Sequence, residues 1–181
     1  MTEDKADKTE KPAEGKTENS MKKIKIEKVI LSTGGLGEDV EKGMKLLKML
    51  SGKKPVRTKA KKRIPAFAIR PGLESGTKVT IRKNPEEILK KMLSAVDNIL
   101  KRKQVADNGF SFGIKEYLEI PGVEYQRDVG ILGLDITVVF KRTGKRVKLR
   151  KIKKGRFPKR QMISKEEIIK FMEDNFQTQF A

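Results

Sequence analysis

The chain has 181 residues, of which 43 are Lys or Arg and 24 are Asp or Glu, so its formal net charge is +19. It contains no Cys and no His, which excludes disulfides, thiolate nucleophiles, Ser-His-Asp triads and the commonest transition-metal ligand. No apolar run approaches the ~20 residues needed to span a bilayer. We therefore predict a soluble, intracellular protein without cofactor or membrane contact, whose charge suits a polyanion such as nucleic acid.

Residues 1–20 differ in composition from the rest of the chain. They hold six acidic residues and four lysines, and their apolar residues are Met1 and two alanines. Such a segment buries too little surface to offset the entropy of ordering, so we predict a disordered tail over 1–20. A single domain is predicted over 21–181, with a net charge of +21 from 39 basic and 18 acidic residues.

The first half of this domain alternates between strand and helix patterns. Glu38 and Asp39 favour the start of a helix because their charges suit its N-terminal dipole, and Gly52 is placed to end it. The predicted elements are a strand over 22–32, a glycine-rich turn over 33–37, a helix over 38–51, and strands over 55–60 and 77–82.

The second half begins with a strong helix signal at Asn84-Pro85-Glu86-Glu87, and the apolar pattern continues to Leu100, so the helix is predicted to end at 107–109. Residues 109–120 are of uncertain type. We expect Phe110 and Phe112 in this segment to complete the core rather than to stack on bases. A strand follows over 131–140, and a last helix starts at Ser164, where Glu167 completes a capping box.

The order strand–helix–strand–strand–helix–strand, followed by a C-terminal helix, predicts an α+β fold. It is the split βαβ arrangement of RRM-like and ferredoxin-like domains, with an open antiparallel sheet and helices on one face. The other face of the sheet is left open for a flat, charged ligand.

Two basic runs favour nucleic acid as that ligand. Residues 141–160 hold twelve Lys or Arg residues and no acid, and residues 53–63 hold seven basic residues. Solvated surfaces usually mix signs, and a nuclear targeting signal rarely sits between a helix end and a strand, so we favour phosphate contacts with counterion release. Val147, Leu149 and Ile152 are interleaved with the second run, which favours a strand-hairpin arm lying on RNA.

Several segments closely resemble the large-subunit ribosomal protein five family, the universal 5S rRNA binders. They are Leu47–Lys62, Ile64, Phe67–Arg70 with Gly72, Val79–Arg82, Gly109–Glu116 and Gly130–Ile136. The motifs follow the family's order over about residues 21–176, and the basic arm and final helix resemble its archaeal and eukaryotic branch. The resemblance implies a structural protein of the cytoplasmic ribosome, not an enzyme. The implied partners are 5S rRNA, large-subunit rRNA, P-site tRNA, and neighbouring proteins of the central protuberance and the small-subunit head.

Together, the resemblance and the charge pattern give three groups of candidate site residues. The 5S rRNA group is Ser32, Lys53, Lys54, Arg57, Thr58, Lys59, Thr80 and Arg82. The rRNA phosphate group is Lys61, Lys62, Arg63, Arg146, Lys148, Arg150, Lys151, Lys153, Lys154, Arg156 and Arg160. A loop over 61–76 is expected to reach tRNA with Phe67, Arg70, Pro71 and Gly72. Ser32 and Lys53 stand where the family usually has Asn and Gln, and a lysine at position 53 favours a phosphate contact.

Two other functions remain open at this point. Charge alone also suits a general nucleic-acid-binding or compacting protein. A nucleotide-using enzyme acting on RNA is disfavoured, because Gly34-Gly35-Leu36-Gly37 lacks the third glycine of a dinucleotide loop and reads as a tight turn.

Overall fold

The computed structural model describes residue 19 and residues 21–181. The predicted disordered tail therefore lies, apart from Asn19, outside the described residues.

One six-stranded antiparallel sheet, in the order β2-β3-β1-β7-β6-β5, organises the fold. Its strands are β1 (Ile24–Gly34), β2 (Val56–Lys59), β3 (Glu74–Ile81), β5 (Val105–Ala106), β6 (Gly109–Ile114) and β7 (Leu134–Arg142). The order β2-β3-β1-β7 is that of a split βαβ fold, as predicted, and β6 and β5 extend the sheet beyond β7. A separate parallel pair joins β4 (Ile99–Leu100) to β8 (Gln179–Phe180).

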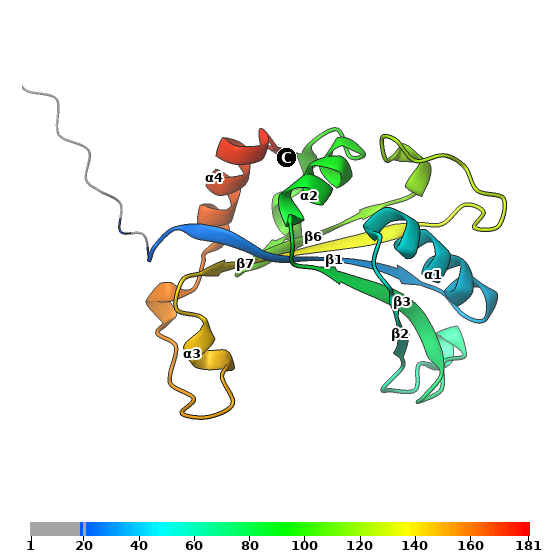
Figure 1. Ribbon diagram of the computed structural model, residues 1–181, viewed down its shortest axis with the longest axis horizontal. Coiled ribbons are helices and arrows are strands. Elements are labelled where there is room, and N and C mark those ends of the chain that lie inside the picture. Colours follow the sequence, from blue (N-terminus) through cyan, green and yellow to red (C-terminus); the bar gives the residue numbers. More distant parts are fainter. Residues whose placement is uncertain (1–18, 20) are drawn as a thin grey trace, which may run out of the picture.

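Three helices, α1 (Glu38–Ser51), α2 (Pro85–Ser94) and α4 (Lys165–Phe176), lie on the same side of the sheet (Figure 1). A fourth, short helix, α3 (Arg146–Leu149), projects to the other side. The predicted α+β class with the main helices on one face is therefore confirmed.

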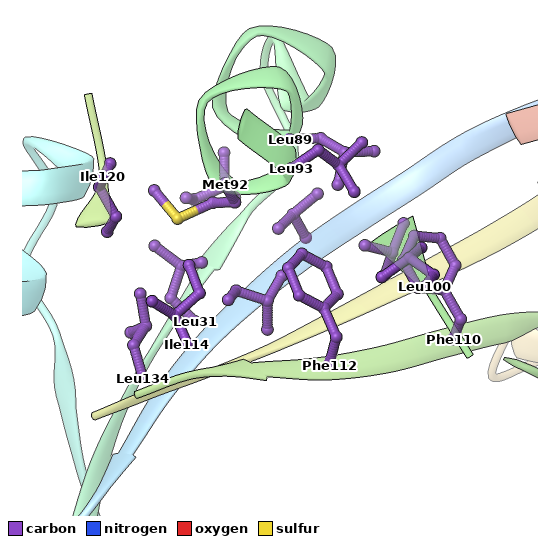
Figure 2. Close-up of a cluster of buried hydrophobic side chains, with 14 of the residues drawn as sticks. Leu31, Leu89, Met92, Leu93, Leu100, Phe110, Phe112, Ile114, Ile120 and Leu134 are labelled. Carbon is purple, nitrogen blue, oxygen red and sulfur yellow. The ribbon is translucent and has the colours of Figure 1, made fainter. Parts of the chain in front are cut away.

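The core fills the space between this helical layer and the sheet (Figure 2). Alternate residues of each strand point into it, which is why Leu134, Ile136, Val138 and Phe140 are all buried on β7. Phe110 and Phe112 are buried on the same side, and the ring of Phe110 lies 5.9 Å from that of Phe140. They complete the core, as expected, and are not available to stack on bases. The segment that carries them, whose type the sequence does not decide, is strand β6.

Close packing fixes helix α1 on strands β1 and β3. The Thr33 and Thr77 hydroxyls share a buried hydrogen bond of 2.7 Å beneath Gly43. A Cβ at position 43 would lie 2.5 Å from the Thr33 Oγ1 atom, so only glycine lets the helix come this close. The helix ends as predicted: Gly52 has a φ of 63° and donates its N–H to the Lys48 carbonyl oxygen at 2.9 Å.

Two predicted elements differ from the structure. Helix α2 ends at Ser94 and does not continue to 107–109, because Asp97 and Asn98 adopt left-handed backbone conformations and Ile99–Leu100 pairs with the C-terminal strand β8. The basic run 141–160 is not a strand hairpin. It leaves β7 after Arg142, forms the four-residue helix α3, and returns through a single turn at Lys159–Gln161.

Candidate nucleic-acid interface

The open face of the sheet carries mostly polar residues and glycine. Strand register aligns its side chains in rows that cross several strands. One row runs Gly113, Asp135, Ser32, Lys78 and Val56, and the next runs Ser111, Thr137, Ile30 and Thr80. Four of these nine residues, Ser32, Thr80, Ser111 and Thr137, carry hydroxyl groups, and Gly113 has no side chain, so a flat ligand could approach the backbone closely and find hydrogen-bond partners.

Three of the predicted 5S rRNA residues, Ser32, Thr58 and Thr80, lie on this open face. Thr58 lies at its β2 edge, opposite Gly76 of β3. Gly76 is buried, and a Cβ there would lie 2.5 Å from the Thr33 carbonyl oxygen. The three hydroxyl residues therefore share one surface, although they come from three different strands.

Two other residues of that predicted group, Arg57 and Lys59, face the helical side. Arg57 pairs across the sheet with the buried Thr77 and forms ion pairs with Glu74 at 3.0 Å and Glu41 of α1 at 3.8 Å. Lys59 stands opposite Glu74, beyond a bulge in the β2–β3 pairing. The structure thus separates these two cations from the hydroxyl surface.

The remaining members of the group lie at the margins of the sheet. Lys53 and Lys54 are exposed in the connection between α1 and β2, and Arg82 is exposed directly after β3. These positions could contact phosphates around a ligand whose bases or sugars rest on the open face.

The connection between β2 and β3, residues 60–73, projects on the open side of the sheet (Figure 1). It is shorter than the predicted loop 61–76 because β3 begins at Glu74. Ile64 and Ile69 exchange two backbone hydrogen bonds, of 3.0 and 3.1 Å, around a single turn at Pro65–Phe67. This bridge presents Phe67 with 67% of its surface exposed.

The charges of this connection also face solvent. Lys61, Lys62 and Arg63 precede the turn, and Arg70, Pro71 and Gly72 follow it. All six residues are exposed. The structure therefore brings the predicted tRNA-reaching residues together on one projection, with three of the predicted phosphate-binding residues at its entrance.

The basic arm, residues 141–160, projects on the same side at the opposite end of the sheet (Figure 1). The members predicted to bind phosphate lie at its surface: Arg146, Lys148, Arg150, Lys151, Lys153, Lys154, Arg156 and Arg160. The apolar residues between them do not form a buried underside, since Leu149 and Ile152 are 64% and 78% exposed.

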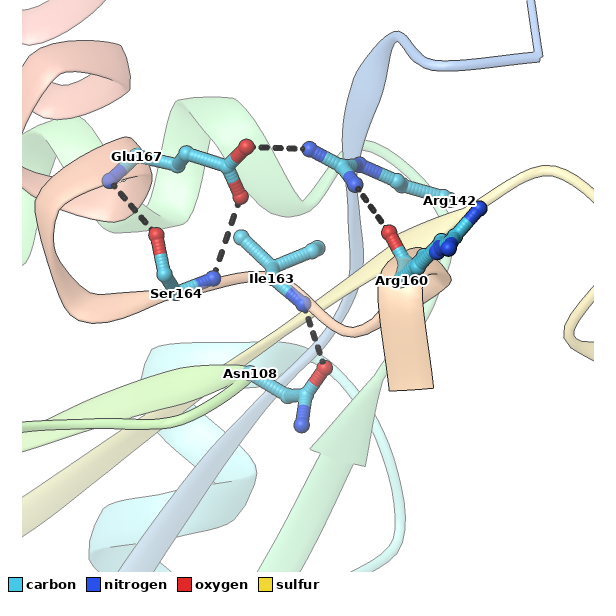
Figure 3. A network of polar contacts seen from close by, with 6 residues as sticks. All are labelled: Asn108, Arg142, Arg160, Ile163, Ser164 and Glu167. Atoms are coloured by element: carbon cyan, nitrogen blue, oxygen red, sulfur yellow. Dashed lines mark hydrogen bonds and ion pairs between the residues drawn. The ribbon is translucent and has the colours of Figure 1, made fainter. Parts of the chain in front are cut away.

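Polar contacts hold the root of the arm against helix α4 (Figure 3). The Arg142 guanidinium donates to Glu167 Oε1 at 2.6 Å and to the Arg160 carbonyl oxygen at 3.3 Å, so the two ends of the arm are linked. Glu167 also accepts from the Ser164 backbone N–H in the predicted capping box. Asn108 accepts from the Ile163 N–H at 3.1 Å and links the same region to the β5–β6 turn.

The pKa of Glu167 reflects this network. Partial burial alone would raise it, but the backbone hydrogen bond from Ser164 and the hydrogen bond and charge of Arg142 outweigh burial. The pKa of the Glu167 carboxyl is therefore lowered, and the group is held in its charged form. A second ion pair, Lys145 to Glu27 at 2.6 Å, fixes the arm to a bulge in β1.

The chain matches the family model Ribosomal protein L5 over residues 19–70 and the model for the C-terminus of the same ribosomal protein family over residues 74–171. The chain belongs to the ribosomal protein L5 family. It is 46% identical to the large ribosomal subunit protein uL5 of Nanoarchaeum equitans, over 90% of this chain and 98% of the relative. The uL5 protein of Sulfurisphaera tokodaii is 43% identical, over 91% of this chain and 96% of its own.

This membership confirms the predicted family, and the archaeal relatives agree with the predicted branch. As an L5 family member, the chain is a protein of the large ribosomal subunit and not an enzyme. Separately, none of the helices in the described part of the chain is long and apolar enough to cross a membrane.

Sequence patterns did not reveal the full set of open-face residues. Lys78, Ser111, Asp135 and Thr137 lie among the predicted residues but had no assigned role. The signal for them was the strand alternation itself, since each follows or precedes a core residue. Their neighbours on other strands depend on register, which one sequence does not display.

Proposed function

We propose that this L5 family protein binds 5S rRNA on the open face of its sheet and anchors it, with large-subunit rRNA, in the central protuberance. The observation that carries the proposal is the arrangement of three surfaces. A hydroxyl-rich sheet face lies between two projecting basic segments, the β2–β3 connection and the arm 141–160. This arrangement suits a folded RNA, which offers phosphates along its edges and sugars or bases between them.

The proposed roles follow from position. Ser32, Thr58 and Thr80 donate or accept hydrogen bonds at sugars and bases, and Lys53, Lys54 and Arg82 bind phosphates at the margin. The arm neutralises further rRNA phosphates. Arg57 and Lys59 were also predicted to bind 5S rRNA. Because both face the helical side, where Arg57 is held by Glu41 and Glu74, we propose that they do not contact the RNA directly.

We further propose that the β2–β3 connection contacts P-site tRNA. Its Ile64–Ile69 bridge holds the turn that carries the exposed Phe67, and Arg70 follows directly. Backbone hydrogen bonds of 2.8 and 2.9 Å link Ala60 to Leu73 and Gly72 at the base of the projection. Neighbouring proteins of the central protuberance and of the small-subunit head are proposed as additional partners.

A titration of 5S rRNA at several salt concentrations tests the main proposal. We expect tight binding whose log K falls steeply and linearly with log salt concentration, because many phosphates release counterions on contact. Random RNA hairpins of equal length and a duplex DNA of equal charge serve as controls. A flat salt dependence, or equal affinity for the controls, would contradict 5S recognition, and a preference for duplex DNA would favour the general compacting function.

A further inference from the structure

The carboxylate of Asp135 sits within the open face. Among the paired open-face positions of the described strands it is the acidic one, and the other charged residue in its row is Lys78. It stands on the central strand β7, between Ser32 of β1 and Gly113 of β6. A carboxylate in the middle of a surface for a polyanion calls for a physical reason.

The side chain of Asp135 is exposed and lies over bare backbone. A Cβ added to Gly113 would come within 3.2 Å of the Asp135 Oδ1 atom, so the missing side chain at Gly113 makes room for the carboxylate. Neither carboxylate oxygen has an ion pair or hydrogen bond within residues 21–181. The Ser32 hydroxyl donates to the backbone carbonyl of Asp135, at 3.4 Å, and not to its side chain. Both carboxylate oxygens are thus free to accept hydrogen bonds from a ligand.

The chemistry of RNA limits what such an acceptor can bind. Phosphate oxygens repel a carboxylate, so Asp135 must face a part of the RNA that carries donors. Amino groups in the deep major groove of an RNA helix are out of reach of side chains. The wide minor groove displays two donors, the 2′-hydroxyl of every nucleotide and the guanine amino group, and of these only the guanine amino group distinguishes G·C pairs. A flat sheet face can approach either of these.

We propose that Asp135 is a base-reading residue, whose carboxylate accepts a hydrogen bond from the amino group of a guanine in the RNA on the open face. This inference rests on the proposed binding of 5S rRNA and adds a source of sequence specificity to it. Lys78 in the same row and the two basic segments beside the sheet bind any RNA, whereas Asp135 repels phosphates and favours RNA that offers a guanine amino group at this place.

Charge alone and base reading predict opposite effects of Asp135→Asn. If Asp135 only repels RNA, its removal tightens binding to every RNA. If it reads guanine, D135N weakens binding to 5S rRNA about tenfold, as expected for the loss of one specific base contact, while binding to random RNA hairpins stays the same or tightens. Asp174→Asn, on the exposed surface of α4, removes an equal charge on the helical side and is the matched control.

Inosine interference identifies the guanine. The 5S rRNA is transcribed with sparse inosine, which lacks the amino group, and bound and free pools are sequenced for the unmodified chain and for D135N. We expect at least one guanosine position at which inosine weakens binding of the unmodified chain and D174N but not of D135N. Gly113→Ala, which crowds the carboxylate, should weaken interference at that same position.

Identical interference patterns for the unmodified chain and D135N would overturn the inference, as would a D135N variant that binds 5S rRNA as tightly or more tightly. Thermal melting of each variant, expected to be unchanged because Asp135 is exposed, shows that altered binding is not loss of folding. If the unmodified chain prefers 5S rRNA to hairpin controls, 5S binding stands whatever D135N does. If it shows no such preference, the proposed function fails first and the base-reading role fails with it.

Discussion

Individual ion pairs decide which charges of the basic arm are available to RNA. Of the twelve basic residues in 141–160, Arg142 and Lys145 are bound by Glu167 and Glu27. The other ten have no carboxylate partner within the described residues. Two partly buried ion pairs therefore position the root of the arm, and the charges beyond it are left for phosphates. The arm's geometry depends on Glu167, because its carboxylate accepts hydrogen bonds both from Arg142 and from the Ser164 N–H at the start of α4.

Replacing Glu167 by Gln should destabilise the protein by about 1–2 kcal/mol at pH 7, because Arg142, which is only 12% exposed, loses its charged partner. The folded-state pKa of Glu167 is lowered from the ordinary value of 4.5. Its contribution is therefore present above the unfolded-state value and is lost as the pH falls through the folded pKa. Urea unfolding at pH 7 and at about pH 3 should show a difference between E167Q and the unmodified chain that shrinks in acid.

Glu166→Gln is the control for this experiment, since Glu166 shares the first turn of α4 but has no ion pair in the described part. It should cost less than E167Q at pH 7. Equal losses for the two variants would mean that the helix dipole, and not the link to Arg142, accounts for the effect.

At the scale of elements, local signals in the sequence predicted most boundaries correctly. The start of α1 at Glu38, its end at Gly52 and the capping box of α4 are each set by residues within one helical turn. The buried alternation of β7 was equally local. These features required no knowledge of the rest of the chain.

The errors arose where distant segments compete with local preference. The apolar pattern after Pro85 continues to Leu100 and mimics a longer helix, but Ile99 and Leu100 pair with Gln179 and Phe180, which lie far along the chain. The candidate site shows the same limit. Thr58 and Thr80 could be assigned to one surface from family resemblance. The sequence did not predict that the Arg57 side chain faces Glu41, because this depends on the β2–β3 register and on the packing of α1.

The β2–β3 connection is an element that can be removed cleanly. Deleting residues 61–70 joins Ala60 to Pro71-Gly72-Leu73. The Ala60 N–H already donates a hydrogen bond to the Leu73 carbonyl oxygen, at 2.8 Å. Pro-Gly is the sequence of a type II turn, and Gly72 has the required positive φ of 87°. We expect the deletion to leave 5S rRNA binding nearly intact and to weaken P-site tRNA retention in reconstituted ribosomes.

Filter binding to 5S rRNA and tRNA dissociation rates from assembled ribosomes are the two measurements. A Phe67→Ala variant is the finer companion, because it removes the exposed ring and keeps the backbone bridge between Ile64 and Ile69. Collapse of 5S binding in the deletion variant would show that the connection anchors rRNA rather than reaching tRNA.

For the whole molecule, the balance of charge opposes folding in the absence of RNA. Residues 21–181 carry 39 basic and 18 acidic residues, and the arm and the β2–β3 connection, which project on one side of the sheet, hold sixteen of the basic residues and none of the acidic ones. The helical side carries much of the acid, as in the first turns of α1, α2 and α4. The molecule is therefore polarised, with its uncompensated cations on the side proposed to face RNA.

This polarity predicts that salt stabilises the free protein. Raising NaCl from about 0.05 to 0.5 M shortens the Debye length to a few ångströms and screens the repulsion among the arm's cations, so the melting temperature should rise by a few degrees. The matched variant replaces Lys151, Lys153 and Lys154 with Gln; these residues are exposed and lack carboxylate partners in the described chain. Its melting temperature should be higher at low salt and should respond less to NaCl. A melting temperature that falls with salt in both proteins would mean that ion pairs such as Arg142–Glu167 outweigh the repulsion, and the excess charge would then carry no folding cost for RNA to relieve.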